Sequence, residues 1–379
     1  MYRYQKTGRY FAQVADDIKD IAQQELLGLG ASDTRQAYRG IHCTADPKIM
    51  YAVNYHARLI TRVLAPLLVF DCHSAKYLYL QAKKICWEDF LTDGDTFAVF
   101  ATVANSAIRH SKYAALRLKD SVVDRFREQS GNRPSVDTRN PGLWINLHIE
   151  NNRATISIDT SGGSLHRRGY RQSSVEAPMI ETLAAAIIRL TEWDGTRPLV
   201  DPFCGSGTLL CEAYMHAARM PGAMLRETFG FMRLPDYNAA LWETVRRQGL
   251  DAIRPVEQGL ISGSDISPGA VAAARQNCAV IDNDNRITLE VRDIFERGKI
   301  ENSVIVCNPP YGVRLKSKSD LGRFYKRLGD FLKHNCRDST AYIYFGDRKY
   351  LKHIGLRPSW KKKLNNGGLD GRLAKFEMY

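Results

Sequence analysis

The pattern of apolar and polar positions divides the chain of 379 residues into three regions. In the first region, short strand-like and helical stretches alternate, and a helix predicted over residues 17–27 ends at Gly28 and Gly30. Glycines at these positions are typical of helix ends, because they adopt the left-handed backbone that closes a helix at little cost. The pattern predicts a small ferredoxin-like α+β unit, which we assign to residues 1–64.

The second region, residues 65–160, combines one long helix with a hairpin. The helix is predicted over residues 111–129, because four apolar side chains recur on one of its faces. These side chains are Ala115, Leu118, Val122 and Phe126. Two strands follow, over residues 143–150 and 154–159, with a turn at two asparagines between them. Basic residues occupy the other faces of the helix, where they could contact phosphates or simply face solvent.

The third region, residues 161–379, alternates short apolar runs with helical patterns, as α/β proteins do. Strands are predicted to end near Asp201, Asp265, Asp293 and Cys307. A long insertion after the first helix contains a predicted helix over residues 238–247. We expect a mostly parallel sheet that ends in an antiparallel hairpin at its edge.

Composition adds information about partners and location. The chain has a formal net charge of +13 and is 44% hydrophobic. It is therefore long enough for two or three compact domains, and its charge indicates either a polyanionic partner or a generally basic surface. The sequence has no apolar run of 18 residues and no signal-peptide core at its start, so we expect a soluble cytoplasmic protein without a membrane partner.

The eight cysteines are scattered, without a Cys-x-x-Cys pair and without a histidine at metal-ligand spacing. We therefore predict free thiols and no metal site. Cys204 and Cys307 lie inside chemically interesting segments. Cys307 ends an apolar run, however, and is better explained as a small buried strand residue than as a nucleophile.

A glycine turn between a short strand and a helix predicts a ligand-binding loop. Gly205 and Gly207 allow the backbone to approach a ligand, and the following helix would present free N–H groups. Leu210 stands where a dinucleotide-binding loop has its third glycine, and no acidic residue follows at the required distance. A nicotinamide cofactor is therefore disfavoured.

Two acids are predicted at the carboxyl ends of neighbouring strands. Asp265 precedes a helix marked by Ser267 as its cap, and a carboxylate there could accept both hydroxyls of a ribose. Asp293 could accept a hydrogen bond from an adenine amino group, with Ile266 and Ile294 as apolar walls. Either acid alone could equally be a helix cap or lie in a solvated turn. Together with the glycine turn, they point to the edge of an α/β sheet where ligands bind.

The tetrapeptide Asn308-Pro309-Pro310-Tyr311 directly follows an apolar strand. The amino group of guanine or adenine is a poor nucleophile, because its lone pair is delocalised into the ring. The Asn308 amide oxygen and the Pro309 carbonyl can each accept a hydrogen bond from an N–H of this amino group, and together they direct its lone pair outward. The two prolines stiffen the turn, and Tyr311 offers an aromatic face to a base lifted out of its stack. An ordinary strand-ending turn is the alternative explanation.

On these residues the chain resembles the S-adenosylmethionine-dependent methyltransferases of class I. More narrowly, it resembles the ribosomal RNA large subunit methyltransferase K/L family, in the half that methylates guanine N2 and carries a THUMP domain. The segments that carry the resemblance are 110–124, 164–171, 177–178, 201–208 and 308–312. The resemblance implies a Rossmann-like domain with a seven-stranded sheet over residues 161–379, a THUMP unit over residues 65–160, and S-adenosylmethionine as cofactor.

The resemblance also implies the roles of individual residues. The catalytic residues would be Asn308, Pro309, Pro310 and Tyr311. The cofactor-binding residues would be Asp201, Phe203, Cys204, Gly205, Ser206, Gly207, Thr208, Asp265, Ile266, Asp293 and Ile294. Contacts to RNA are expected from Arg109, Lys112, Arg117, Arg167, Arg168, Arg171 and Arg314.

The predicted function is direct methylation of guanine N2 in 23S ribosomal RNA, either naked or in a pre-ribosomal particle. Two alternatives stay open at this point. The tetrapeptide is shared with adenine-N6 methyltransferases that act on DNA or RNA. A non-catalytic RNA-binding or ribosome assembly factor could also have kept the fold, although the intact acids and Asn308 argue against it.

Overall fold

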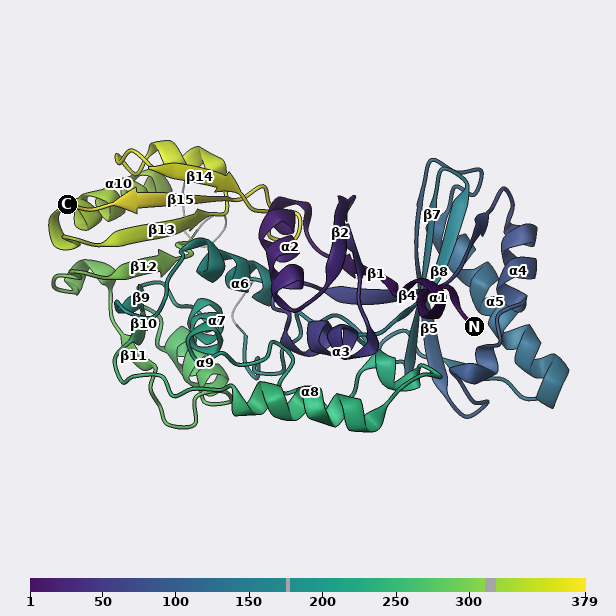
Figure 1. Ribbon diagram of the computed structural model, residues 1–379. Helices are drawn as coiled ribbons and strands as arrows, with labels where there is room; N and C mark the ends of the chain where they lie inside the picture. The colour runs from purple at the N-terminus through teal and green to yellow at the C-terminus, as the bar shows by residue number, and fades with distance from the viewer. Residues whose placement is uncertain (175–177, 311–317) are drawn as a thin grey trace. The chain divides into compact units, whose positions relative to one another are not determined.

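The computed structural model describes residues 1–174, 178–310 and 318–379 (Figure 1). Tyr311 and Arg314 lie outside the described residues. The chain forms two compact units. Unit 1 contains Met1–Leu165 and Arg226–Gln248, and unit 2 contains His166–Leu225 and Gly249–Tyr379.

Unit 1 is built on a sheet of eight strands in the order β2-β3-β1-β4-β8-β7-β5-β6. The strands are β1 (Arg9–Gln13), β2 (Ser32–Ala37), β3 (Gly40–Thr44), β4 (Arg62–Asp71), β5 (Thr96–Ala104), β6 (Ser135–Val136), β7 (Leu143–Glu150) and β8 (Arg153–Asp159). The helices are α1 (Arg3–Thr7), α2 (Lys19–Gly28), α3 (Pro47–His56), α4 (Ala75–Lys83), α5 (Ser111–Ser130) and most of α8 (Ala239–Asp251). The predicted boundary at residue 64 falls inside β4, which pairs with both β1 and β8. The two predicted N-terminal units therefore share one sheet.

The segment 226–248 belongs to unit 1, although its neighbours in sequence belong to unit 2. An aromatic cluster explains this placement. The ring of Phe231 lies 4.5 Å from that of Tyr51, and the ring of Trp242 lies 5.3 Å from that of Tyr55, both measured between ring centroids. Gly230 lies so close to β8 that a Cβ atom there would meet the Asp159 carbonyl oxygen at 1.9 Å. Burial of these rings and the close backbone approach hold the insertion in unit 1.

Unit 2 contains the mostly parallel sheet that the sequence predicts, with the seven strands that the family resemblance implies, in the order β11-β10-β9-β12-β13-β15-β14. The strands are β9 (Leu199–Asp201), β10 (Ile261–Asp265), β11 (Thr288–Val291), β12 (Val304–Cys307), β13 (Thr340–Phe345), β14 (Trp360–Lys363) and β15 (Arg372–Glu377). The helices are α6 (Glu181–Leu190), α7 (Thr208–Ala217), α9 (Pro268–Cys278) and α10 (Lys318–Asn335). The first five strands in this order are parallel, and β15 and β14 form the antiparallel hairpin at the edge.

The strand order reverses beside β9. From β9 the chain continues to β10 and β11 on one side, and then returns to β12 on the other side. In open α/β sheets, such a switch point leaves a crevice at the carboxyl ends of the strands. The structure therefore places the ends of β9, β10 and β12 where a ligand site is expected.

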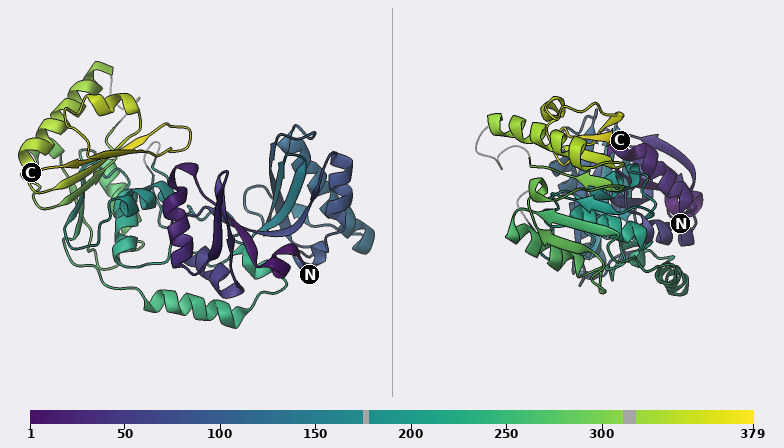
Figure 2. Two further views of the ribbon diagram at one scale, coloured as in Figure 1. Left: turned by 45° about the horizontal axis from the view of Figure 1, so that its top comes forward. Right: turned by 90° about the vertical axis from the view of Figure 1, so that its left-hand side faces the viewer.

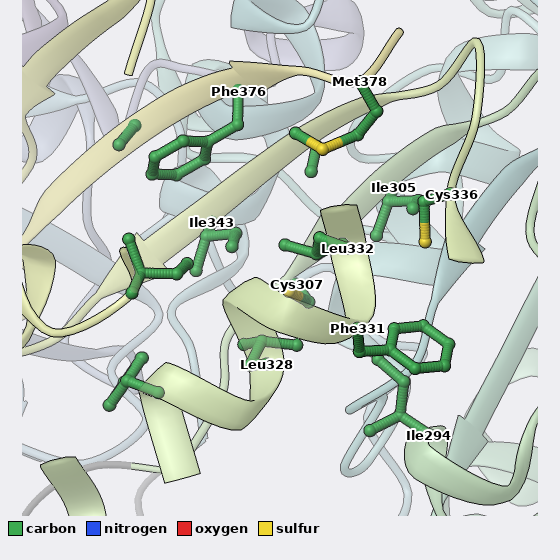
Figure 3. Packing of buried hydrophobic residues seen from close by; sticks show 14 of the residues in the cluster. Ile294, Ile305, Cys307, Leu328, Phe331, Leu332, Cys336, Ile343, Phe376 and Met378 are labelled. Carbon is green, nitrogen blue, oxygen red and sulfur yellow. The ribbon is translucent and has the colours of Figure 1, made fainter. Parts of the chain in front are cut away.

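The core of unit 2 joins α10 to one face of this sheet (Figure 3). Leu328 and Leu332 from α10 pack with Ile305 of β12 and Ile343 of β13, all of them buried. The apolar side chains of α10 recur three or four positions apart and so share one helix face. Figure 2 shows α10 beside the sheet from two further directions. This packing fixes the helix that follows the predicted catalytic tetrapeptide.

Within the described part of the chain, none of the helices combines the length and the apolar character needed to cross a membrane.

Candidate active site

A pocket of about 620 Å³ lies in unit 2 at the carboxyl ends of the parallel strands. Most of the residues predicted to bind a cofactor line it. Those residues are Asp201, Phe203, Cys204, Gly205, Ser206, Thr208, Asp265, Ile266, Asp293 and Ile294. Asn308 and Pro310 line the same pocket, so two segments a hundred residues apart in sequence meet there. Gly207 and Pro309 are not among the lining residues.

The glycine loop between β9 and α7 has the backbone that the sequence predicts. Gly205 and Gly207 have φ values of 54° and 82°, in the left-handed region that glycine adopts readily. At Gly207 a Cβ atom would also lie 3.2 Å from that of Ala274 in α9. The loop is therefore closely packed against its neighbours, and α7 begins directly after it, with its first N–H groups free of helical partners.

Asp265 fastens the glycine loop to β10. Its carboxylate accepts hydrogen bonds from the backbone N–H of Gly205 at 3.0 Å and of Ser267 at 2.9 Å. A carboxylate has about four lone-pair positions, so two remain for other donors such as hydroxyl groups. Ser267 caps α9 through the N–H of Ala270, as the sequence predicts. Asp265 is thus held in place before any ligand arrives.

Asp293 and two isoleucines form the neighbouring part of the pocket. Asp293 follows β11 and accepts a hydrogen bond from the backbone N–H of Phe295 at 3.0 Å. Ile294 is buried, whereas Ile266 is 70% exposed although it is a large apolar residue. Covering an exposed isoleucine with a flat apolar ring removes apolar surface from water, and this burial favours binding of the ring. The arrangement fits an adenine ring beside Ile266, with its amino group near Asp293.

Asp201 differs from the other two acids because it is only 1% exposed. Its carboxyl group accepts a hydrogen bond from the Phe203 N–H at 3.0 Å. Burial, and then the negative charge of Asp265, raise the pKa of Asp201 to about 8. The raised pKa favours the protonated, neutral form of Asp201 at the start of the loop.

Asn308 follows β12 and places a hydrogen-bond acceptor in the site. Its amide oxygen is buried and has no hydrogen-bond partner among the residues that the structure describes. An unsatisfied buried acceptor costs about 1–3 kcal/mol, so its presence in a native protein calls for an explanation, and a catalytic role is one. Pro309 beside it is buried. The position of the Asn308 oxygen suits a donor group entering the pocket.

The surroundings of Cys204 and Cys307 make both thiols unreactive. All eight cysteines of the chain are free. Burial raises the pKa of Cys204, and it raises the pKa of Cys307 well above its ordinary value. Neither thiol is ionised near neutral pH, so neither is a ready nucleophile.

Two of the arginines predicted to contact RNA are engaged inside unit 2. The side chain of Arg168 is 1% exposed and forms an ion pair with Glu212, which is fully buried, at 3.3 Å. Arg171 pairs with Glu181 at 2.8 Å and donates to the hydroxyl of Thr208 at 3.1 Å. These contacts brace the start of α7. Arg168 in particular is not accessible to RNA in this arrangement.

The other predicted RNA contacts lie mostly on accessible surfaces. Three of them are exposed: Arg109, which lies just before α5, Lys112 in the first turn of α5, and Arg167. Arg117 pairs with Asp120 at 3.3 Å and lies over the ring of Tyr79, with 4.9 Å to its centroid. Their role in binding RNA stays a prediction.

Asn277 of α9 is a residue that the sequence analysis missed. Its amide oxygen accepts the backbone N–H groups of Gln172 and Ser173, at 2.7 and 2.9 Å. Its amide nitrogen donates to the carbonyls of Ser173 and Ser206, both at 2.8 Å. One buried side chain therefore ties the segment before α6 to the cofactor loop. No local signal identifies it, because its partners lie about 70 and 105 residues away.

Two residues of α10, Phe324 and Arg327, also line the pocket. Phe324 lies 5.7 Å from Phe203 and 5.9 Å from Phe295, measured between ring centroids. The guanidinium carbon of Arg327 lies 3.8 Å above the centroid of the Phe295 ring. The sequence alone could not show which side chains of α10 face the pocket.

In the described ranges, no group of three or more His, Cys, Asp or Glu side chains is arranged to hold a metal ion. The predicted absence of a metal stays a prediction.

Models of three known domain families match the chain. Residues 168–375 match the RMKL-like methyltransferase domain. Residues 72–159 match the THUMP domain, and residues 9–64 match the RlmL ferredoxin-like domain.

Two relatives resemble the chain over nearly its whole length. "Putative RNA methyltransferase slr0064" of Synechocystis sp. is 36% identical, over 98% of this chain and 97% of that protein. "Ribosomal RNA large subunit methyltransferase K/L" of Syntrophotalea carbinolica is 35% identical over 98% of this chain. The chain spans 53% of the length of that second protein.

Two solved structures share the fold over the same extent. The crystal structure of SMU.472 complexed with SAH has a TM-score of 0.86 and 27% identity, covering 98% of each chain. That of a "predicted N6-adenine-specific DNA methylase" from Listeria monocytogenes has a TM-score of 0.84 and 26% identity, covering 99% of this chain and 97% of the other. The first of these structures holds SAH, and the pocket of the present chain is lined by most of the residues predicted to bind S-adenosylmethionine.

The raised pKa of Asp201 predicts a pH-dependent stability. The folded protein keeps this proton up to about pH 8, whereas the unfolded chain loses it near pH 4. The free energy of unfolding should therefore fall as the pH rises between these values. Asp201→Asn removes the titrating group. We expect Tm, measured from about pH 5 to about pH 8, to fall more steeply for the wild type than for the variant. Parallel curves would show that Asp201 is ionised in the folded protein.

The contacts of Asn277 predict a role in holding the cofactor loop. Asn277→Ala leaves four backbone groups without this partner, and the Ser206 carbonyl is one of them. We expect the Kd for S-adenosylmethionine, measured by calorimetry, to rise roughly tenfold. The exposed Asn283 offers a matched control, and Asn283→Ala should bind normally. Equal affinities of the two folded variants would contradict the role.

Proposed function

The chain belongs to the RMKL-like methyltransferase family, and from this premise we propose that it methylates guanine N2 in large-subunit ribosomal RNA. The observation that carries the proposal is the buried Asn308 amide oxygen, which has no partner among the described residues and lies in the pocket that suits S-adenosylmethionine. An acceptor held there is the group needed to orient an amine.

The pocket offers a complementary surface for the cofactor. Asp265 would accept the ribose hydroxyls, while Ile266 and Ile294 would flank the adenine and Asp293 would accept its amino group. The glycine loop from Phe203 to Thr208 would follow the methionine part, with the first N–H groups of α7 directed toward its carboxylate. When bound, S-adenosylmethionine supplies an electrophilic methyl group, which passes to the amine nitrogen as the carbon–sulfur bond breaks.

The chain's own residues would orient the nucleophile. The Asn308 oxygen and the Pro309 carbonyl would each accept a hydrogen bond from one N–H of the amine. The lone pair would then point away from the base plane. One proton leaves to solvent after transfer. Tyr311 would stack on the base and offset the few kcal/mol needed to extract it. Catalysis then comes mainly from proximity and orientation.

RNA is the substrate that the other features support. A THUMP domain model matches residues 72–159, and the net charge of +13 suits a polyanion. Relatives that match over nearly the whole chain are named as methyltransferases of large-subunit ribosomal RNA. The exposed Arg109, Lys112 and Arg167 would contact phosphates. A cytoplasmic location, and a ribosomal RNA or pre-ribosomal particle as partner, are parts of this proposal.

A second candidate is methylation of adenine N6. It is favoured by one solved structure of similar fold, described as an adenine-specific DNA methylase. The Asn-Pro-Pro-Tyr arrangement would orient the amino group of adenine in the same way. The THUMP match favours RNA over DNA as the nucleic acid. The two candidates therefore differ in the base that is methylated, guanine or adenine.

Asn308→Ala tests the chemistry. The variant lacks the acceptor that orients the amine but keeps the groups that contact the cofactor. We expect turnover to fall by about a thousandfold or more, with the Kd for S-adenosylmethionine changed less than about twofold. Asn302, exposed and ahead of β12, provides the control variant Asn302→Ala. Undiminished methylation by Asn308→Ala would refute the assignment.

The methylated nucleoside tests the choice of base. The purified protein is incubated with radiolabelled S-adenosylmethionine and ribosomal RNA from cells that lack its gene, and the RNA is then digested. We expect N2-methylguanosine as the labelled nucleoside. N6-methyladenosine would keep the chemistry and overturn guanine. Absence of label, with cofactor binding intact, would overturn naked ribosomal RNA as the substrate.

A further inference from the structure

The tetrapeptide after β12 has few ways to anchor itself. The pairing of β12 with β13 ends at Cys307, before the tetrapeptide begins. Pro309 and Pro310 have no backbone N–H to donate. The backbone of these two prolines can therefore form hydrogen bonds only through its carbonyl groups. A small displacement of Asn308 would misdirect any group that it orients.

Tyr325 of α10 provides such an anchor. Its hydroxyl donates a hydrogen bond to the Pro310 carbonyl, with 3.3 Å between the two oxygens. The side chain is completely buried. Its ring is stacked on that of Tyr350 at 5.2 Å and on that of Phe345 at 5.3 Å, measured between centroids. These two rings fix the direction of the Tyr325 hydroxyl.

The helix that carries Tyr325 is itself held against the sheet. Leu321, Leu328 and Leu332 lie on the same helix face and are buried in the core that contains β12 and β13. The neighbouring Phe324 lines the pocket. Two consecutive aromatic residues of α10 thus act on different parts of the site, one as a pocket wall and one through the Pro310 carbonyl.

We propose that Tyr325 is a positioning residue for methyl transfer, which fixes the Pro310 carbonyl and thereby the direction of the Asn308 and Pro309 acceptors. The inference rests on the proposed function of Asn308. It assigns to Tyr325 no contact with the substrate or the cofactor. Its effect should appear in the rate of the chemical step and not in cofactor binding.

Tyr325→Phe removes only the hydroxyl and keeps the stacked ring. A displacement of about 1 Å in an active site can lower the rate a hundredfold, and we expect a loss of roughly tenfold here, because the prolines retain part of the order. The loss should appear in kcat and in the rate constant of a single turnover, both measured on RNA that does not yet carry the methyl group. The KM for RNA and the Kd for S-adenosylmethionine should stay within about twofold of the wild type.

Tyr342→Phe is the matched control. Tyr342 is 5% exposed, lies on β13 of the same sheet, and donates through its hydroxyl to the Thr191 carbonyl at 3.0 Å. The variant loses the same kind of buried hydrogen bond away from the pocket. We expect its kcat to equal that of the wild type, even if Tm falls by a similar amount in both variants.

Hydrogen exchange provides a readout that does not depend on activity. In Tyr325→Phe, amide exchange in the peptide containing Asn308 should become at least about threefold faster, whereas Tyr342→Phe should leave it unchanged. If the wild type methylates no RNA, the proposed function fails while the exchange measurement still decides the role of Tyr325. Unchanged exchange, or equal kcat values in both variants where the wild type is active, would overturn the proposal.

Discussion

The pairing of β9 with both β10 and β12 is the constraint on which the site depends. Because the chain runs outward on one side of β9 and returns on the other, three strand ends meet at one edge of the sheet. The glycine loop follows β9, Asp265 is the last residue of β10, and Asn308 directly follows β12. The sheet therefore brings these three segments together, and contacts from other elements then fix the individual side chains.

The parts of the fold that the sequence predicts are those with a strong local pattern. The four apolar residues of β12 are buried on both faces of a central parallel strand, so an unbroken apolar run marks them. The junction between the two predicted N-terminal units has no such pattern. It depends on the pairing of β4 with β8, in which Leu64 lies opposite Asp159, and on tertiary packing that no short segment encodes.

The candidate site divides in the same way. Segments in which several site residues are contiguous, such as the glycine loop, could be predicted because loop geometry restricts their composition. Asn277, Phe324 and Tyr325 could not, since each lies in a helix and acts on a segment distant in sequence. Arg168 shows the converse case, in which the sequence suggested a role that the structure does not support. Its charge suggested RNA, but the oppositely charged partner, Glu212, lies 44 residues away and becomes apparent only when α7 is in place.

The insertion 226–248 has a consequence for how the protein can be divided. The backbone passes from one unit to the other three times, at residues 165/166, 225/226 and 248/249. A fragment ending at residue 165 would lack the rings of Phe231 and Trp242 and would expose Tyr51 and Tyr55 to water. A fragment beginning at residue 166 would carry the same insertion with its apolar side uncovered. The two units are therefore not interchangeable modules. A gene fusion or recombination event at any of these three crossings would have to keep both parts of this aromatic cluster together.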